Sequence, residues 1–100
     1  MTKYDKLVRD NIPEIIQQNG KKCKYRIADH AEFYEKLLDK LQEEVQEFLA
    51  NPSAEELADV QEVVDTISSC NAWDIYGAGL KKYRTNGAFY NRYILEEVMD

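Results

Sequence analysis

The feature that most constrains the fold is a pair of helical patterns separated by a chain-breaking turn. Apolar side chains recur at three- and four-residue spacing over residues 30–50, and again from Ser53 to about Ala72. Asn51-Pro52 separates the two patterns, and proline cannot continue a helix. Because a link this short makes consecutive helices run antiparallel, their apolar faces should meet. We therefore predict an all-α fold built on an antiparallel helix hairpin or bundle.

Short elements are expected on the N-terminal side of this hairpin. Pro13 fits an early helical position, so residues 14–19 can form a short helix that ends at Gly20. The alternating pattern of residues 21–28 indicates an extended segment, which either pairs with another segment or is simple coil. Asp29 then has the form of a helix N-cap.

The C-terminal side gives a weaker pattern. Residues 74–84 favour a third helix, which Gly77 and Gly79 weaken. Asn86-Gly87 is a turn signal. Residues 90–99 fit a helix or an extended chain equally well, and the two alternatives stay open.

The composition indicates one soluble domain, residues 1–100. The chain has 100 residues, 44% of them hydrophobic and 32% charged, and a net charge of −6. That negative charge argues against a nucleic-acid polymer or an anionic membrane as the main partner. Cys23 and Cys70 form no CxxC pair, the N-terminus has no apolar signal region, and no apolar run reaches membrane length. We expect a cytoplasmic protein with reduced thiols.

Acidic residues dominate the predicted hairpin. Residues 41–80 contain nine Asp and Glu residues, and no Lys or Arg occurs between Lys40 and Lys81. A solvated helix usually interleaves Glu with Lys at four-residue spacing. Some other positive charge is therefore expected to neutralise these carboxylates, and a divalent cation is the first candidate.

Helical geometry sorts the acids of the first long helix. Glu44 and Glu47 lie about 60° apart, and Glu44 is closer to the apolar face. Glu43 falls farther round, nearly opposite that face. We therefore expect Glu44 and Glu47 to point inward, with Glu43 in a supporting position.

The second long helix contains two ExxD pairs that the same geometry separates. Glu56 lies in the middle of the apolar face and Asp59 at its border, whereas Glu62 and Asp65 point toward solvent. A carboxylate that faces apolar surroundings must be protonated, paired or bound to a metal. We therefore choose Glu56 and Asp59 as the functional pair.

Two interpretations of these acids remain open. Four carboxylates from two packed helices would form a hard anionic site that suits Mg²⁺ or Mn²⁺, and such a site favours chemistry on a phosphate chain. Alternatively, the capping box of residues 53–56 explains Glu56 as a structural residue. The acids of the first helix would then be solvated surface.

The same residues resemble a known signature. Glu43-Glu44-Val45-Gln46-Glu47, followed by Glu56-Leu57-Ala58-Asp59, is similar to the EExxE…ExxD motif of the all-α nucleoside triphosphate pyrophosphohydrolases, the MazG-like superfamily. The opening residues 6–13, KLVRDNIP, resemble the phosphoribosyl-ATP pyrophosphohydrolase-like or house-cleaning branch. Residues 84–89 loosely match the basic Gly-Phe motif of that branch.

The resemblance implies a helical dimer or tetramer that uses Mg²⁺ to cleave a nucleotide between its α and β phosphates. It implies that the metal is held by Glu44, Glu47, Glu56 and Asp59. A carboxylate such as Glu43 or Glu44 would take a proton as general base. The candidates for binding the triphosphate are the basic residues near the two chain ends, whose alternative role is surface solubility: Lys6, Arg9, Lys81, Lys82 and Arg84.

Three functional hypotheses follow. The first is a Mg²⁺-dependent nucleotide pyrophosphohydrolase acting on a nucleoside triphosphate or a related phosphoribosyl nucleotide. The second is a helical module that binds nucleotide or metal without turnover. The third is a helix-hairpin oligomerisation unit with a solvated acidic face.

Overall fold

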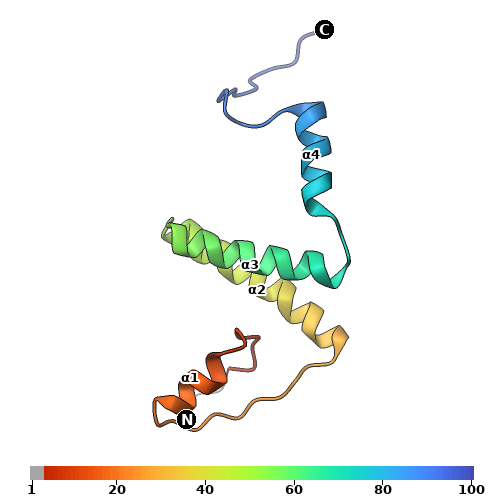
Figure 1. Cartoon of the computed structure of the whole chain (residues 1–100). Coiled ribbons are helices and arrows are strands. Elements are labelled where there is room, and N and C mark those ends of the chain that lie inside the picture. The colour runs from red at the N-terminus through yellow and green to blue at the C-terminus, as the bar shows by residue number, and fades with distance from the viewer. Residues whose placement is uncertain (1–3) are drawn as a thin grey trace.

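The two long helices lie where the apolar periodicity predicts them. In this computed structural model, which describes residues 4–100, α2 covers His30–Ala50 and α3 covers Ala54–Cys70, and the shorter helices are α1 (Ile12–Gln18) and α4 (Ile75–Asn86) (Figure 1). The described residues contain no strand, so the prediction of an all-α fold is confirmed.

Local hydrogen bonds set the starts of α2 and α3. The Asp29 carboxylate accepts a hydrogen bond from the backbone N–H of Glu32 at 2.9 Å. The Ser53 hydroxyl accepts one from the backbone N–H of Glu56 at 3.1 Å. Each bond satisfies a backbone donor that the first turn of a helix leaves free. The positive end of the helix dipole also stabilises an acidic residue in that turn.

The hairpin has a narrow core. Helix α3 folds back along α2 after the link of residues 51–53 (Figure 1). Within residues 4–100, only Leu37 and Val63 are buried apolar residues, at 2% and 7% exposure. The apolar face predicted from the sequence is wider than the surface the two helices cover, because several of its residues remain exposed: Leu38, Val45, Leu49 and Leu57.

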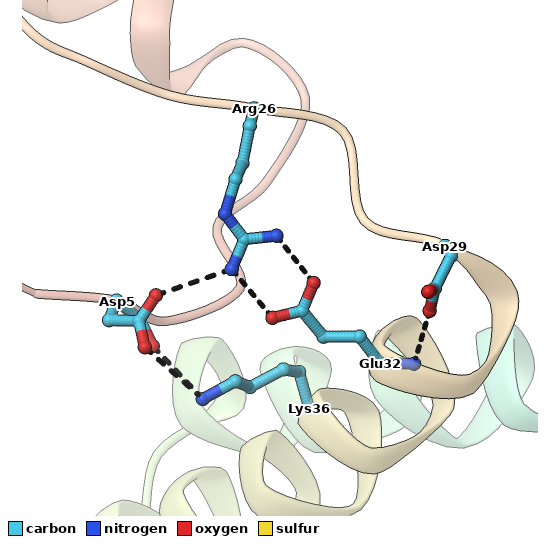
Figure 2. Close-up of polar contacts among 5 residues, drawn as sticks. All are labelled: Asp5, Arg26, Asp29, Glu32 and Lys36. Carbon is cyan, nitrogen blue, oxygen red and sulfur yellow. Dashed lines mark hydrogen bonds and ion pairs between the residues drawn. The ribbon is translucent and has the colours of Figure 1, made fainter.

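Ion pairs attach the N-terminal region to the start of α2. Residues 21–29 form coil with no strand partner in the described chain, which decides between the two alternatives for this segment. Arg26 pairs with Glu32 and Asp5, and Lys36 also pairs with Asp5 (Figure 2). The coil and Asp5 are thereby held beside the first turns of α2.

The C-terminal region extends away from the hairpin. Helix α4 is capped at its start by Asp74, whose carboxylate accepts from the backbone N–H of Gly77, and at its end by Gly87, where φ is 83°. Residues 87–100 form no helix, which answers the question left open for residues 90–99. Because α4 points away from α2 and α3, the chain measures 64 × 31 × 22 Å (Figure 1). No helix in residues 4–100 has both the length and the apolar character needed to cross a membrane.

Candidate metal centre

Three carboxylates meet where α2 and α3 face each other. Glu44 comes from α2, while Glu56 and Asp59 come from the first turns of α3. One oxygen from each lies within 4.8 Å of those of the other two. The antiparallel arrangement brings the C-terminal half of α2 beside the start of α3, so residues distant in sequence converge. The structure thus brings together three of the four proposed metal ligands.

Burial leaves two oxygens of this cluster without a partner. Glu44 is only 7% exposed, and Glu56 is half-buried. Oε2 of each is buried with no hydrogen-bond partner among the residues the structure describes. A bare buried carboxylate costs several kcal/mol. A proton or a further cation bound to these two oxygens would stabilise this arrangement.

The pKa of the Glu44 carboxyl also reflects this lack of positive charge around the cluster. Burial raises the pKa of Glu44 above its ordinary value, and the neighbouring Glu47 carboxyl raises it further. Lys40 lies 3.4 Å from Glu44 Oε1 and opposes both effects without cancelling them. A divalent cation would supply the missing positive charge.

The expectation that Glu47 points inward with Glu44 is wrong, because Glu47 is exposed and lies outside the three-residue cluster, beyond the surface that α3 covers. It is still near enough to Glu44 to affect that residue's pKa. The residues of the rejected pair, Glu62 and Asp65, are exposed.

Two cations of the N-terminal segment reach the acidic centre, by which we mean the three clustered carboxylates together with Glu43. Arg9 Nη2 lies 2.8 Å from Asp59 Oδ1, and Lys6 Nζ lies 3.3 Å from Glu43 Oε1. These partners are 50 and 37 residues apart in sequence. The absence of Lys and Arg from the acidic stretch therefore does not leave its carboxylates unpaired, because the fold brings Arg9 and Lys6 close to them.

Lys40 is a partner that the sequence pattern contained. Its ammonium lies 3.4 Å from Glu43 Oε1 and 3.4 Å from Glu44 Oε1, at i+3 and i+4 spacing on α2. In the sequence Lys40 stands at the boundary of the acidic stretch, and this spacing predicts contact with both carboxylates. Burial raises the pKa of Glu43, but the hydrogen bond from Lys6 and the charge of Lys40 outweigh burial, so the pKa is lowered overall.

The other basic candidates lie elsewhere. Lys81, Lys82 and Arg84 are exposed on α4, which points away from the hairpin (Figure 1). None of the three forms an ion pair within residues 4–100. Within the described part of one chain, the cations that contact the acidic centre are therefore Lys6, Arg9 and Lys40.

The cap at Ser53 does not use the Glu56 carboxylate. Ser53 accepts from the backbone N–H of Glu56, so this half of the capping box is present. Oε2 of Glu56 has no hydrogen-bond partner in the described chain, which leaves this oxygen free to bind a cation. The structural and functional roles of Glu56 are therefore compatible, because they use different atoms.

The donor set fits a hard divalent cation. It consists of carboxylate oxygens alone, which Mg²⁺ and Mn²⁺ prefer over nitrogen and sulfur ligands.

Comparisons with protein-family models, with curated proteins and with solved structures find no match for this chain. The resemblance to the MazG-like superfamily therefore rests on motifs of the sequence.

Proposed function

We propose that this protein is a Mg²⁺-dependent nucleotide pyrophosphohydrolase. It would cleave a nucleoside triphosphate, or a related phosphoribosyl nucleotide, between the α and β phosphates to give a monophosphate and pyrophosphate. The observation that carries the proposal is the pair of buried, unpartnered carboxylate oxygens on Glu44 and Glu56, beside Asp59. The EExxE…ExxD motif supports the same reaction.

The carboxylates of the acidic centre would have two roles, metal binding and proton transfer. Glu44, Glu56 and Asp59 would hold the cation, Mg²⁺ or Mn²⁺, and the resemblance adds the exposed Glu47 to this set. When bound, this cation supplies positive charge to the phosphate chain and acidifies a water molecule. Glu43 lies outside this set of ligands and beside it in sequence, so its carboxylate would be the one to accept a proton as general base.

The N-terminal cations would bind the phosphate chain. Arg9 and Lys6 already lie against carboxylates of the centre, and both side chains are about half exposed. A triphosphate arriving at this edge of the hairpin would therefore meet a guanidinium and an ammonium group. Lys81, Lys82 and Arg84 would assist only if another chain brought them close.

Self-association and a cytoplasmic location belong to the same proposal. The chain's radius of gyration is 18.6 Å, against about 13 Å for a compact domain of this length. The α2–α3 hairpin also leaves apolar side chains exposed, including Leu49 and Leu57. A second copy packed on the hairpin would cover this surface, as a homodimer or homotetramer. The unpaired Cys23 and Cys70 fit a reducing compartment.

The test is pyrophosphate release from a panel of nucleoside and deoxynucleoside triphosphates, with and without Mg²⁺. We expect release of pyrophosphate and a monophosphate from at least one substrate, and none after chelation of the metal. A folded protein that releases no pyrophosphate from any substrate contradicts the proposal. In that case, stabilisation by Mg²⁺ or Mn²⁺ would assign the non-catalytic binding module, and its absence the oligomerisation module.

A further inference from the structure

Asp5 has a left-handed backbone conformation in the N-terminal segment. Its φ is 49°, in a region that Asp and Asn adopt more often than other residues with a side chain. Contacts with neighbouring elements can select this conformation. Asp5 has those contacts, because both of its carboxylate oxygens and its backbone carbonyl face cations (Figure 2).

The contacts join Asp5 to two different elements. Lys36 of α2 donates to the Asp5 carbonyl oxygen at 3.1 Å and lies 4.0 Å from Asp5 Oδ2. Arg26, in the coil before α2, lies 3.5 Å from Asp5 Oδ1. The same guanidinium makes two hydrogen bonds to Glu32 in the first turn of α2 (Figure 2). Asp5 is thus attached to α2 directly and through Arg26.

The residues that follow Asp5 are the two cations of the acidic centre. Lys6 is the next residue, and Arg9 follows four positions later. Their side chains contact Glu43 and Asp59, whereas Asp5 itself contacts neither. Fixing Asp5 on α2 therefore limits where Lys6 and Arg9 can lie.

We propose that Asp5, held by Arg26 and Lys36, is a positioning residue that sets Lys6 and Arg9 at the acidic centre to receive the phosphate chain. This inference rests on the proposed function for its ligand, a nucleoside triphosphate. Asp5 does not touch that ligand. Its contribution is to reduce the freedom that Lys6 and Arg9 lose when they bind phosphate.

The size of the effect follows from the exposure of these ion pairs. The Asp5 side chain is 80% exposed, and exposed pairs contribute little individually. The two-bond contact of Arg26 with Glu32 and the shared partners make this a network, which is the favourable case. We expect Asp5→Asn to weaken nucleotide binding about two- to fivefold. Asparagine tolerates a positive φ, so the backbone is kept while the charge is lost.

The first measurement requires neither metal nor turnover. Side-chain ¹⁵N relaxation reports the mobility of the Arg9 guanidinium in the whole protein. We expect Asp5→Asn to increase that mobility and the matched charge change Asp39→Asn to leave it unaltered, because Asp39 is exposed and forms no ion pair within residues 4–100. Unchanged Arg9 mobility in folded Asp5→Asn protein overturns the proposal, whether or not pyrophosphate is released.

The second measurement is a double-mutant cycle on the affinity for an α,β-methylene nucleoside triphosphate in the presence of Mg²⁺. If Asp5 acts through Lys6 and Arg9, Asp5→Asn weakens binding in the wild-type background and has no further effect in a Lys6→Gln/Arg9→Gln background. Equal effects in the two backgrounds would instead assign Asp5 a general structural role. Pyrophosphate release by the wild type is tested separately, so the failure of the positioning role and that of the proposed function are distinguishable.

Discussion

The contact between Arg9 and Asp59 places a positive charge against one of the proposed metal ligands. Both side chains are partly exposed, so we assign their pair roughly 0.4–1 kcal/mol. Removing the guanidinium makes the centre more negative. We therefore predict that Arg9→Gln raises Mg²⁺ affinity about two- to fivefold in the absence of nucleotide, as measured by isothermal titration calorimetry.

The matched control for Arg9→Gln is Lys24→Gln, which removes one exposed cation that forms no ion pair within the described part of the chain. Its Mg²⁺ affinity should equal that of the wild type. An unchanged or lower affinity in Arg9→Gln would show that Arg9 does not compete with the cation.

Glu32 gives a pH prediction for the N-terminal network. The hydrogen bond from Arg26 lowers the pKa of Glu32, against the opposing effect of burial and with a smaller contribution from the Arg26 and Lys36 charges. A lowered pKa means that the ion pair stabilises the fold above the pKa of the unfolded state and that this stabilisation is lost as the pH falls through the folded-state pKa. We predict that Arg26→Gln raises the pKa of Glu32.

The measurement for that prediction is a pH titration of the Glu32 side-chain ¹³C carboxyl shift. Lys24→Gln serves again as the control, because it changes the charge of the same coil without removing a partner of Glu32. A Glu32 titration midpoint that does not move in Arg26→Gln would mean that the pair seen in Figure 2 does not persist in solution.

At the residue scale, helical geometry predicted part of the site from sequence. It identified Glu44 as inward-facing and Glu62 as exposed, because one face of each helix must be apolar. It did not predict the contacts of Arg9 or Lys6, since these depend on how the N-terminal segment crosses the hairpin. The signal for Lys40 was present as i+3 and i+4 spacing.

At the scale of elements, the start of α3 combines a helix cap with a proposed ligand. The Ser53 hydroxyl caps the backbone N–H of Glu56, while the Glu56 carboxylate belongs to the acidic centre. We predict that Ser53→Ala lowers the free energy of unfolding by about 1 kcal/mol and leaves Mg²⁺ affinity nearly unchanged. Glu56→Gln should lower the Mg²⁺ affinity, because it removes a ligand charge. It should leave the free energy of unfolding of the metal-free protein nearly unchanged, because it keeps the backbone N–H that Ser53 caps.

Chemical denaturation and Mg²⁺ titration of both variants check this separation. If Glu56→Gln destabilises the metal-free protein as strongly as Ser53→Ala and leaves Mg²⁺ affinity intact, Glu56 is a capping residue and not a ligand.

The helix boundaries show which local signals are decisive. Asp29, Ser53 and Asn51-Pro52 predicted the limits of α2 and the start of α3 because capping and chain-breaking are local properties. The end of α3 came two residues earlier than the predicted Ala72, where φ is 53°. Nothing in the local pattern requires alanine to leave the helix there. The buried Ser68 donates to the Trp73 carbonyl oxygen at 2.7 Å and fixes the turn.

At the scale of the whole molecule, the apolar periodicity predicts that more apolar side chains are buried than are buried in the single chain. Periodicity identifies the apolar face of a helix but not what covers it. Tyr76 and Tyr83 of α4 and Phe89 beyond it are exposed, as is Leu49 of α2. This surface supports the proposed self-association, in which a second copy would complete the core that α2 and α3 begin.

The most direct test of the central claim measures pyrophosphate release, in the presence of Mg²⁺, by variants of each of the two ExxD pairs of α3. The pairs have the same spacing and lie on the same helix, but Glu56 and Asp59 belong to the acidic centre while Glu62 and Asp65 are exposed. We predict that Glu56→Gln and Asp59→Asn abolish release and that Glu62→Gln retains it nearly in full. Loss of release in Glu62→Gln, with release retained in Glu56→Gln, would contradict the assignment of the site.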